Sequence, residues 1–369
     1  MSSPRPRILH LDAGREWRGG QRQVLLLADG LRARGYEPLV VGSPGSPLVE
    51  RLRARGIAAS TIRMRSDWDL VAARRLRALM RTWRPDVVHA HDARSHAIAL
   101  AALFARRGLT VPLVVTRRVP FPPRGVRLKY GPRVAHFIAI SGAVRDAMLT
   151  AGVAAERIDV VHSGVPAPAA DIEARDWRAE RGWPADSVVC GVVGAMSAEK
   201  GVATLTAVGE RLPPAVRDRV RLVLLGGAPK GAGPARGDEI VGGVRAYRAG
   251  FVDAVHEATA GLDVLWHPSR AEGLGTAVID AMALGVPPVA FAVGGLPELI
   301  EPGRSGLLAP AGDVDAFARE AARLVEDATL RRTLGAGARD RARVFDATKM
   351  VDGVERVYAR VLAATAATR

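Results

Sequence analysis

The stretch "HPSRAEGLGTAVIDAMALGVPPVA", residues 267–290, begins where an apolar strand ends, passes through a glycine-rich turn and becomes a helix of small apolar residues. Its last residues start another apolar strand. A strand, a helix and a strand in this order predict one repeat of a parallel α/β sheet. Two acids interrupt the apolar pattern, Glu272 at the turn and Asp280 inside the helix. Because burying an unpaired acid costs several kcal/mol, we expect Asp280 to have a partner.

The same alternation fills most of the chain. Short apolar segments, for example 7–12, 85–91 and 188–194, alternate with amphipathic segments of helical period. Strands that are apolar on both faces indicate a parallel sheet covered by helices on both sides. A chain of 369 residues is long enough for two cores. The predicted fold class is therefore α/β, with two Rossmann-like domains and a cleft between them.

A segment rich in Pro, Ala and charged residues separates the two halves. We predict an N-terminal domain over 1–165, a linker over 166–187 and a C-terminal domain over 188–345. The remaining residues, 346–369, are predicted to form a helix that crosses back to the N-terminal domain.

Several protein classes do not fit this sequence. Cys190 is the only cysteine, which argues against a disulfide framework and fits a reducing compartment. No apolar run reaches the length of a transmembrane helix, and the first residues read as a strand rather than a signal peptide. We therefore expect a cytoplasmic protein. Nucleic-acid binding is disfavoured, because aromatic residues make up 5% of the chain and no nucleic-acid motif is present.

The net charge of +15 lies entirely in the first half of the chain. Residues 1–165 hold 28 Lys and Arg against 12 Asp and Glu, whereas residues 166–369 hold 25 against 26. Such asymmetry favours an anionic partner for the first half over the alternative, compositional drift in an arginine-rich chain, because drift alone should not be so lopsided.

Three turns could accommodate a phosphate. Gly19 and Gly20 open a helix after the first strand, and Lys200 precedes a helix after the first strand of the second domain. Glu272 and the residues that follow it make the third turn. Amide groups at a helix N-terminus attract anions, and glycines allow close approach. Each turn could equally be an ordinary strand–helix connection with a solvated lysine or a helix-capping acid.

At these residues the sequence resembles a retaining GT-B glycosyltransferase of family 4, and the resemblance covers essentially the whole chain. Its most specific part is "EGLGTAVIDAMALGVPPV", which is similar to that family's signature of two acids followed by a small-residue helix. The glycines at 19–20, "VVHAHD" at 87–92, "EKG" at 199–201, "VGGLPELI" at 293–300 and "GRSGLLAPAGD" at 303–313 add to it.

The resemblance implies a nucleotide-sugar donor, a UDP- or GDP-sugar, held mainly by the second domain. It implies that Glu272 meets the donor sugar, Asp280 the ribose and Lys200 the diphosphate. It further implies that His91 points toward the sugar and that no metal or other cofactor is needed. The remaining donor contacts that it implies are Gly19, Gly20, Gly273, Leu274, Gly275 and Thr276. Two positions depart from the family, Asp280 in place of Glu and Ala195 in place of a frequent arginine.

The resemblance also implies that the acceptor binds the N-terminal domain. Arg15, Arg18, Arg117 and Arg118 are candidates for holding it, since arginine recognises phosphate through two hydrogen bonds. Similar sequences act in lipopolysaccharide or other cell-envelope glycan assembly. We therefore expect an anionic, lipid-linked or phosphorylated glycan acceptor and peripheral contact with the inner face of an anionic membrane.

Three other interpretations stay open at this stage. The chain could be a sugar-nucleotide epimerase of the same fold, or a binding protein with a degraded donor site. His89 and His91, together with Asp92, could suggest a metal site, but no fourth ligand is evident in the sequence.

Overall fold

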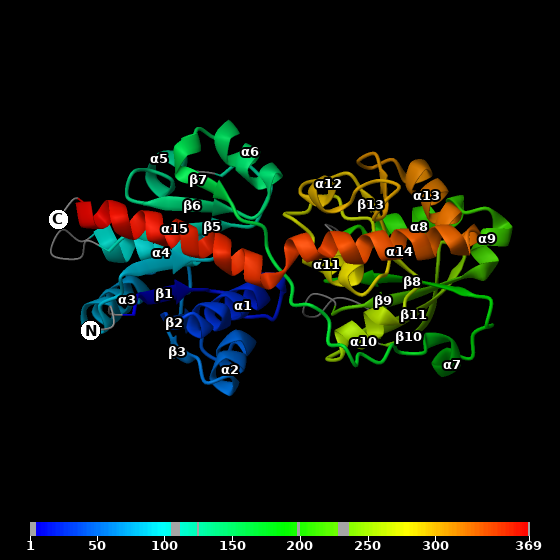
Figure 1. Cartoon of the computed structure of the whole chain (residues 1–369), viewed down its shortest axis with the longest axis horizontal. Helices are drawn as coiled ribbons and strands as arrows, with labels where there is room; N and C mark the ends of the chain where they lie inside the picture. The colour runs from blue at the N-terminus through cyan, green and yellow to red at the C-terminus, as the bar shows by residue number, and fades with distance from the viewer. Residues whose placement is uncertain (1–4, 105–110, 124, 198–199, 228–235, 368–369) are drawn as a thin grey trace. The chain divides into compact units, whose positions relative to one another are not determined.

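A computed structural model describes residues 5–104, 111–123, 125–197, 200–227 and 236–367. It divides the chain into two compact parts. The N-terminal unit contains residues 1–164 and 347–369, and the C-terminal unit contains residues 165–346. Figure 1 shows both units with their helices and strands labelled.

The N-terminal unit is built on a seven-stranded, fully parallel sheet with the strand order β3-β2-β1-β4-β5-β6-β7. The strands are β1 (Arg7–Leu11), β2 (Glu37–Gly42), β3 (Ala58–Thr61), β4 (Val87–Ala90), β5 (Leu113–Arg117), β6 (His136–Ala139) and β7 (Ile158–Val160). The helices are α1 (Gly19–Ala33), α2 (Pro47–Ala54), α3 (Leu70–Trp83), α4 (Ala93–Phe104), α5 (Val126–Lys129), α6 (Gly142–Thr150) and α15 (Ala347–Ala367), with a 3-10 turn at Ala155–Arg157. The order reverses between β1 and β4, which is where α/β sheets bind ligands.

The last helix, α15, belongs to the N-terminal unit although it ends the chain (Figure 1). Its apolar side chains, among them Val351 and Val354, share a buried cluster with Ile8 of β1, Val114 of β5 and Ile138 of β6. This packing explains why β1, β5 and β6 are apolar on the face that α15 covers.

The C-terminal unit has a seven-stranded sheet of order β10-β11-β9-β8-β12-β13-β14, parallel except for the β10–β11 pair. The strands are β8 (Val188–Val193), β9 (Val220–Leu225), β10 (Gly237–Val241), β11 (Val244–Gly250), β12 (Val264–His267), β13 (Pro288–Phe291) and β14 (Leu307–Ala309). The helices are α7 (Trp177–Arg181), α8 (Val202–Arg211), α9 (Pro214–Arg219), α10 (Val255–Ala260), α11 (Thr276–Ala283), α12 (Leu296–Leu299), α13 (Val314–Glu326) and α14 (Ala328–Ala342), with a 3-10 turn at Arg343–Phe345. The predicted α/β class with two Rossmann-like halves is confirmed.

Residues 166–187, which we expected to be a linker, pack into the C-terminal unit. The side chain of Trp177 is buried there, and its indole N–H donates a hydrogen bond to the carbonyl of Ala258 at 2.8 Å. The Pro and Ala content suggested a free connector, but the buried side chain of Trp177 provides enough apolar surface to fix the segment.

Among the described residues, the structure contains no helix that is long and apolar enough to cross a membrane.

Candidate functional site

The signature stretch lies at the carboxyl end of β12. This strand is the neighbour of β8, at the point where the strand order of the C-terminal sheet reverses. Glu272 lies between the end of β12 at His267 and the start of α11 at Thr276. A ligand at this edge would meet side chains from both strand ends.

Glu272 is the centre of a small polar cluster. Its Oε2 atom is ion-paired with the ammonium of Lys200 and lies 3.0 Å from Nε2 of His267. The hydroxyl of Ser269 lies 3.1 Å from the same histidine nitrogen. Burial alone would raise the pKa of Glu272, but the His267 hydrogen bond and the Lys200 charge outweigh it and lower the pKa to about 2. The carboxylate is therefore ionised at neutral pH.

Two glycines allow the surrounding loops to approach this cluster. Gly201 has a φ of 73°, and a Cβ atom there would lie 1.9 Å from the carbonyl oxygen of Pro268. Gly294 has a φ of 53°, and a Cβ atom there would lie 1.7 Å from the carbonyl oxygen of Glu272. Only glycine fits at both positions. The first contact brings Lys200 to the end of β12, while Glu199 of the same motif lies outside the described residues.

The turn into α11 contains the other residues predicted to bind the donor. Gly273, Leu274 and Gly275 follow Glu272, and α11 begins at Thr276. Because Gly275 at the N-cap position has no side chain, it leaves the first amide groups of α11 uncapped. Such an N-terminus favours an anion or an electronegative hydroxyl group.

Asp280 is not an exposed acid. Its side chain is 14% exposed, and its Oδ1 atom lies 3.3 Å from Nε2 of His256, at the start of α10. The expectation that an acid in this apolar helix needs a partner is met by His256. His256 and the roles of His267 and Ser269 were not predictable from the sequence, because only the fold brings these residues to the two acids.

In the N-terminal unit, the adjacent ends of β1 and β4 carry polar side chains. Asp12 follows β1 and accepts hydrogen bonds from the amide of Gly14 at 2.8 Å and from Gln21 at 3.0 Å. Asp92 follows β4 and accepts one from the amide of Ala13 at 2.7 Å. The two acids therefore fix the chain between β1 and α1, whose first residues are Gly19 and Gly20.

The four arginines predicted to hold the acceptor differ in their surroundings. Arg15 is exposed, and Arg18 pairs with Glu16 at 2.6 Å. Arg117 is held by its own loop, where it donates a hydrogen bond to the Tyr130 hydroxyl at 2.7 Å.

Arg118 lies partly buried below Gly20, where burial lowers its pKa to about 10 and the charges of Asp12 and Asp92 oppose that shift. Of the four arginines, Arg118 is thus the one placed between the glycine turn and the strand ends.

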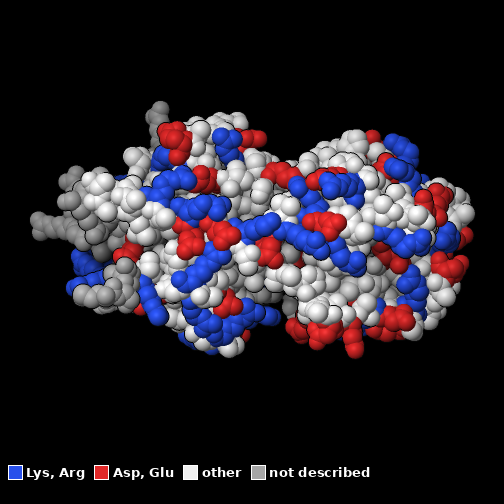
Figure 2. All heavy atoms as spheres, viewed as in Figure 1, with Lys and Arg blue, Asp and Glu red and all other residues white. Residues whose placement is uncertain are grey.

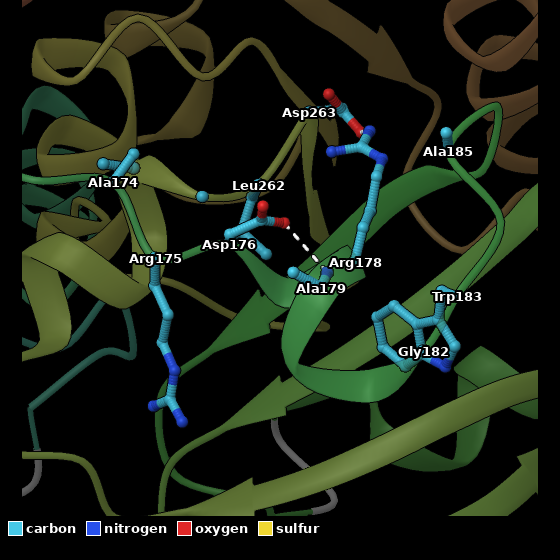
Figure 3. Close-up of a pocket in the computed structure, with 12 residues that line it drawn as sticks. Ala174, Arg175, Asp176, Arg178, Ala179, Gly182, Trp183, Ala185, Leu262 and Asp263 are labelled. Carbon is cyan, nitrogen blue, oxygen red and sulfur yellow. Dashed lines mark hydrogen bonds and ion pairs between the residues drawn. The ribbon is translucent and has the colours of Figure 1, made fainter.

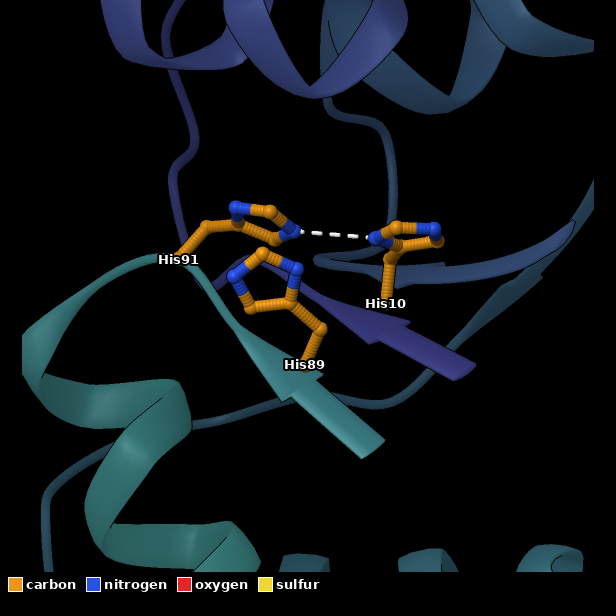
Figure 4. Close-up of side chains that lie close together, drawn as sticks. All are labelled: His10, His89 and His91. Atoms are coloured by element: carbon orange, nitrogen blue, oxygen red, sulfur yellow. Dashed lines mark hydrogen bonds between the residues drawn. The ribbon is translucent and has the colours of Figure 1, made fainter. Parts of the chain in front are cut away.

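Three histidines meet at the same strand ends (Figure 4). Nδ1 of His10, on β1, lies 3.0 Å from Nε2 of His91, and the rings of His89 and His91 lie 4.0 Å apart. One nitrogen from each ring lies within 4.8 Å of the others, a spacing that could hold a metal ion.

Hydrogen bonds already engage four of the six ring nitrogens, because His89 also contacts Tyr358 and Thr116. The arrangement therefore fits a hydrogen-bonded cluster. His91 was a predicted site residue, whereas no motif in the sequence marks His10.

A separate hollow of about 830 Å³ lies in the C-terminal unit beside α7 (Figure 3). Its two arginines are already ion-paired, Arg175 with Glu180 and Arg178 with Asp263. No residue predicted to bind donor or acceptor lines it. It therefore adds nothing to the candidate site.

Comparison with known proteins gives consistent results. Residues 17–167 match the profile described as "Glycosyltransferase Family 4", and residues 187–327 match "Glycosyl transferases group 1". The 2-deoxystreptamine N-acetyl-D-glucosaminyltransferase of Streptomyces fradiae is 33% identical, over 87% of this chain and 85% of its own length. The GDP-mannose-dependent alpha-mannosyltransferase of Mycobacterium tuberculosis is 29% identical, over 80% of this chain and 81% of its own.

Among solved structures, Anabaena HepE in complex with UDP-glucose has a similar fold. The TM-score is 0.81 at 22% identity, and the match covers 96% of this chain and 99% of HepE. At this identity the likeness concerns the fold, and it confirms the predicted GT-B architecture. The comparisons favour neither the epimerase nor the degraded-site alternative.

Proposed function

This chain belongs to the family 4 glycosyltransferases, enzymes that use nucleotide-sugar donors, and from that premise we propose retaining, metal-independent transfer of a sugar from a UDP- or GDP-sugar. The observation that carries the proposal is the cluster of Lys200, Glu272 and His267 at the ends of β8 and β12. Lys200 and Glu272 offer groups that sugar transfer requires, and His267 holds the Glu272 carboxylate.

The leaving diphosphate needs stabilisation of its negative charge. The ammonium of Lys200 supplies a cation, and the uncapped N-terminus of α11 supplies amide groups. Preorganised donors of this kind stabilise a developing anion without a metal ion. Lys200 must exchange its contact with Glu272 for the phosphate, which frees the ionised carboxylate to accept hydrogen bonds from sugar hydroxyls.

The ribose contact is proposed for Asp280. A carboxylate accepts two hydrogen bonds and suits the neighbouring hydroxyl groups of a ribose. His256, 3.3 Å away, restrains the carboxylate before the donor arrives. Asp280→Ala is expected to weaken donor binding, while Glu272→Gln is expected to lower turnover.

The proposed reaction is tested by incubating the enzyme with each donor and following donor cleavage and product by NMR. We expect the new glycosidic bond to keep the anomeric configuration of the donor, and turnover to persist in excess EDTA. Inversion of configuration would overturn the retaining mode. Loss of turnover in EDTA, with recovery on adding Mg²⁺ or Mn²⁺, would overturn metal independence.

For the acceptor we propose an anionic, lipid-linked or phosphorylated glycan of cell-envelope assembly. Support comes from the excess positive charge of residues 1–165 and from Arg118 beside the glycine turn. Figure 2 shows basic side chains over α2, where Arg51, Arg53 and Arg55 are exposed. Charge of one sign around a site raises the local concentration of an oppositely charged substrate.

An exposed apolar edge supports peripheral contact with a membrane. Trp68, Leu70 and Val71 are 73%, 60% and 57% exposed where α3 begins, and Arg63 and Arg65 precede them on the surface. Tryptophan favours the membrane interface, and arginines are attracted to anionic lipid headgroups.

Membrane contact is tested by flotation with vesicles containing phosphatidylglycerol. Wild-type protein should float with them and stay behind with neutral phosphatidylcholine vesicles. Trp68→Ser should lower flotation severalfold, whereas Ile240→Ser, which removes an exposed apolar side chain of the C-terminal unit, should not. Equal behaviour of both variants would contradict a membrane contact at α3.

A second acceptor class is an amine-bearing cyclitol, because the Streptomyces fradiae relative is named for 2-deoxystreptamine. The acids Asp12 and Asp92 at the strand ends supply negative charge that suits a cationic acceptor. Measuring turnover with a panel of phosphorylated glycans and aminocyclitols distinguishes the two acceptor classes. Arg118→Ala should selectively impair the anionic class if the first proposal holds.

A further inference from the structure

We infer that His10 is a positioning residue that fixes the orientation and the protonated nitrogen of His91. The inference rests on the proposed function, in which His91 is the residue that the family resemblance directs toward the donor sugar, and it adds a residue that no sequence motif marks. The hydrogen bond between Nδ1 of His10 and Nε2 of His91, 3.0 Å long, is its structural basis.

Both rings are neutral at physiological pH. Burial lowers the pKa of His10 to about 3 and holds the pKa of His91 well below its ordinary value. A neutral imidazole carries one N–H and one bare nitrogen. A hydrogen bond between two such rings therefore needs the proton on one partner and the lone pair on the other, so each ring determines the tautomer of its neighbour.

The two possible arrangements differ in where they leave an unpaired N–H. His10 Nε2 and His91 Nδ1 are both buried without a partner in the described structure. If His91 donates, the unpaired N–H is Nε2–H of His10, a residue that is fully buried inside the sheet. If His10 donates, the unpaired N–H is Nδ1–H of His91, which follows β4 at the ligand-binding edge.

An unpaired buried donor is costly, and the second arrangement places it at the carboxyl end of β4, the edge at which parallel sheets bind ligands, rather than within β1. The geometry therefore points to Nδ1–H of His10 donating to Nε2 of His91. His91 then presents Nδ1–H on the side of its ring away from His10 (Figure 4). Such a donor suits a hydroxyl or ring oxygen of a sugar.

His89 supports this arrangement and does not compete with it. Its Nδ1 lies 2.6 Å from the Tyr358 hydroxyl, and its Nε2 lies 2.7 Å from the Thr116 hydroxyl. With both nitrogens engaged, its ring lies against that of His91 at 4.0 Å between centroids. The tilted ring contact with His89 on one side and the His10 hydrogen bond at the edge leave the His91 ring little freedom to rotate.

The tautomer is tested directly by two-bond ¹H–¹⁵N NMR on wild-type protein labelled at histidine, with His91 signals assigned by their loss in His91→Asn. We expect His91 to carry its proton on Nδ1 and to have a bare Nε2. A proton on Nε2 would overturn the inference, whatever the activity.

The kinetic test compares His10→Asn with His10→Leu. The asparagine amide N–H₂ can take the place of Nδ1–H, so this variant should keep kcat within about threefold. His10→Leu keeps volume but cannot donate, and it should lower kcat by about 100-fold with little change in KM. If His10→Leu keeps the melting temperature and the donor affinity of the wild type, its loss of kcat does not come from a folding defect. Equal losses in both variants would contradict a positioning role.

His91→Ala separates this inference from the function on which it rests. If His91→Ala leaves kcat unchanged, the proposed role of His91 is wrong. If His91→Ala is impaired while His10→Leu is normal, only the role of His10 is wrong. A tetrahedral Co²⁺ absorption band in the wild type that is lost in His10→Asn would show that a metal joins the rings, and would also overturn the hydrogen-bond account.

Discussion

The ionised carboxylate of Glu272 makes a pH-dependent contribution to the unfolding free energy of the C-terminal unit. Its pKa is about 2 in the folded protein, against an ordinary value of 4.5. The stabilisation is therefore complete above pH 4.5 and is lost as the pH falls toward 2. At about 1.4 kcal/mol for each pKa unit, it amounts to about 3 kcal/mol.

Unfolding measured between pH 7 and 2.5 checks this expectation. The difference in unfolding free energy between wild type and Glu272→Gln should shrink over the acid range. A difference that is constant with pH would show that Lys200 and His267 do not hold the carboxylate ionised.

Substituting Gly201 should impair donor binding more than substituting a glycine that has a similar φ angle but open surroundings. Gly201→Ala adds a methyl group 1.9 Å from the Pro268 carbonyl oxygen, so the segment that carries Lys200 must shift. We expect at least a tenfold loss of donor affinity by calorimetry. Gly312 has a φ of 77° and nothing within 4 Å of an added Cβ. Gly312→Ala should cost only about 1 kcal/mol of stability and leave affinity unchanged; equal affinities for the two variants would contradict the account.

Single residues of the site were only partly predictable. The acids and the glycine turn were identifiable because strand, turn and helix are consecutive in the sequence. The direct pairing of Lys200 with Glu272 was not, because the two residues are 72 positions apart and meet only through the β8–β12 pairing. The contact between His10 and His91 was not predictable for the same reason. The two residues are far apart in the sequence, and only the pairing of β1 with β4 brings them together.

At the scale of elements, the stability of α13 depends on the hydrogen bond that caps its first turn. Asp313 caps it by accepting a hydrogen bond from the amide of Ala316 at 2.8 Å. Asp313→Ala should lower the unfolding free energy by about 1 kcal/mol, measured by urea titration. Asp315→Ala is the matched control, because its surface ion pair with Arg211 contributes little. Equal effects would mean that the cap does not stabilise α13.

Elements with a strong hydrophobic period were predictable, and the antiparallel edge of the C-terminal sheet was not. The apolar segments at 7–12 and 188–194 correspond to β1, Arg7–Leu11, and β8, Val188–Val193. The antiparallel pair β10 and β11 was missed, because it follows a Gly/Pro-rich segment and because β10, the edge strand, is short and only partly buried. Edge strands bury only part of their surface and so leave a weak signal in the sequence.

At the scale of the whole molecule, the stability of the N-terminal sheet depends on α15, the last helix of the structure. α15 shares the apolar cluster of β1, β4, β5 and β6 and provides the hydroxyl of Tyr358 to His89. Deleting residues 347–369 should therefore remove hydrogen-exchange protection from these four strands while β8, β9 and β12 stay protected. Unchanged protection in the N-terminal sheet would contradict this dependence.

The central claim is that the C-terminal unit binds a nucleotide-sugar donor through Glu272, Lys200 and Asp280. A melting series with UDP-, GDP- and ADP-sugars tests it most directly, because a ligand that binds only the folded state raises the melting temperature. We predict that donors of one base raise the melting temperature of wild-type protein, and that Asp280→Ala abolishes the rise. No response to any donor, or an equal response from wild type and Asp280→Ala, would contradict the account.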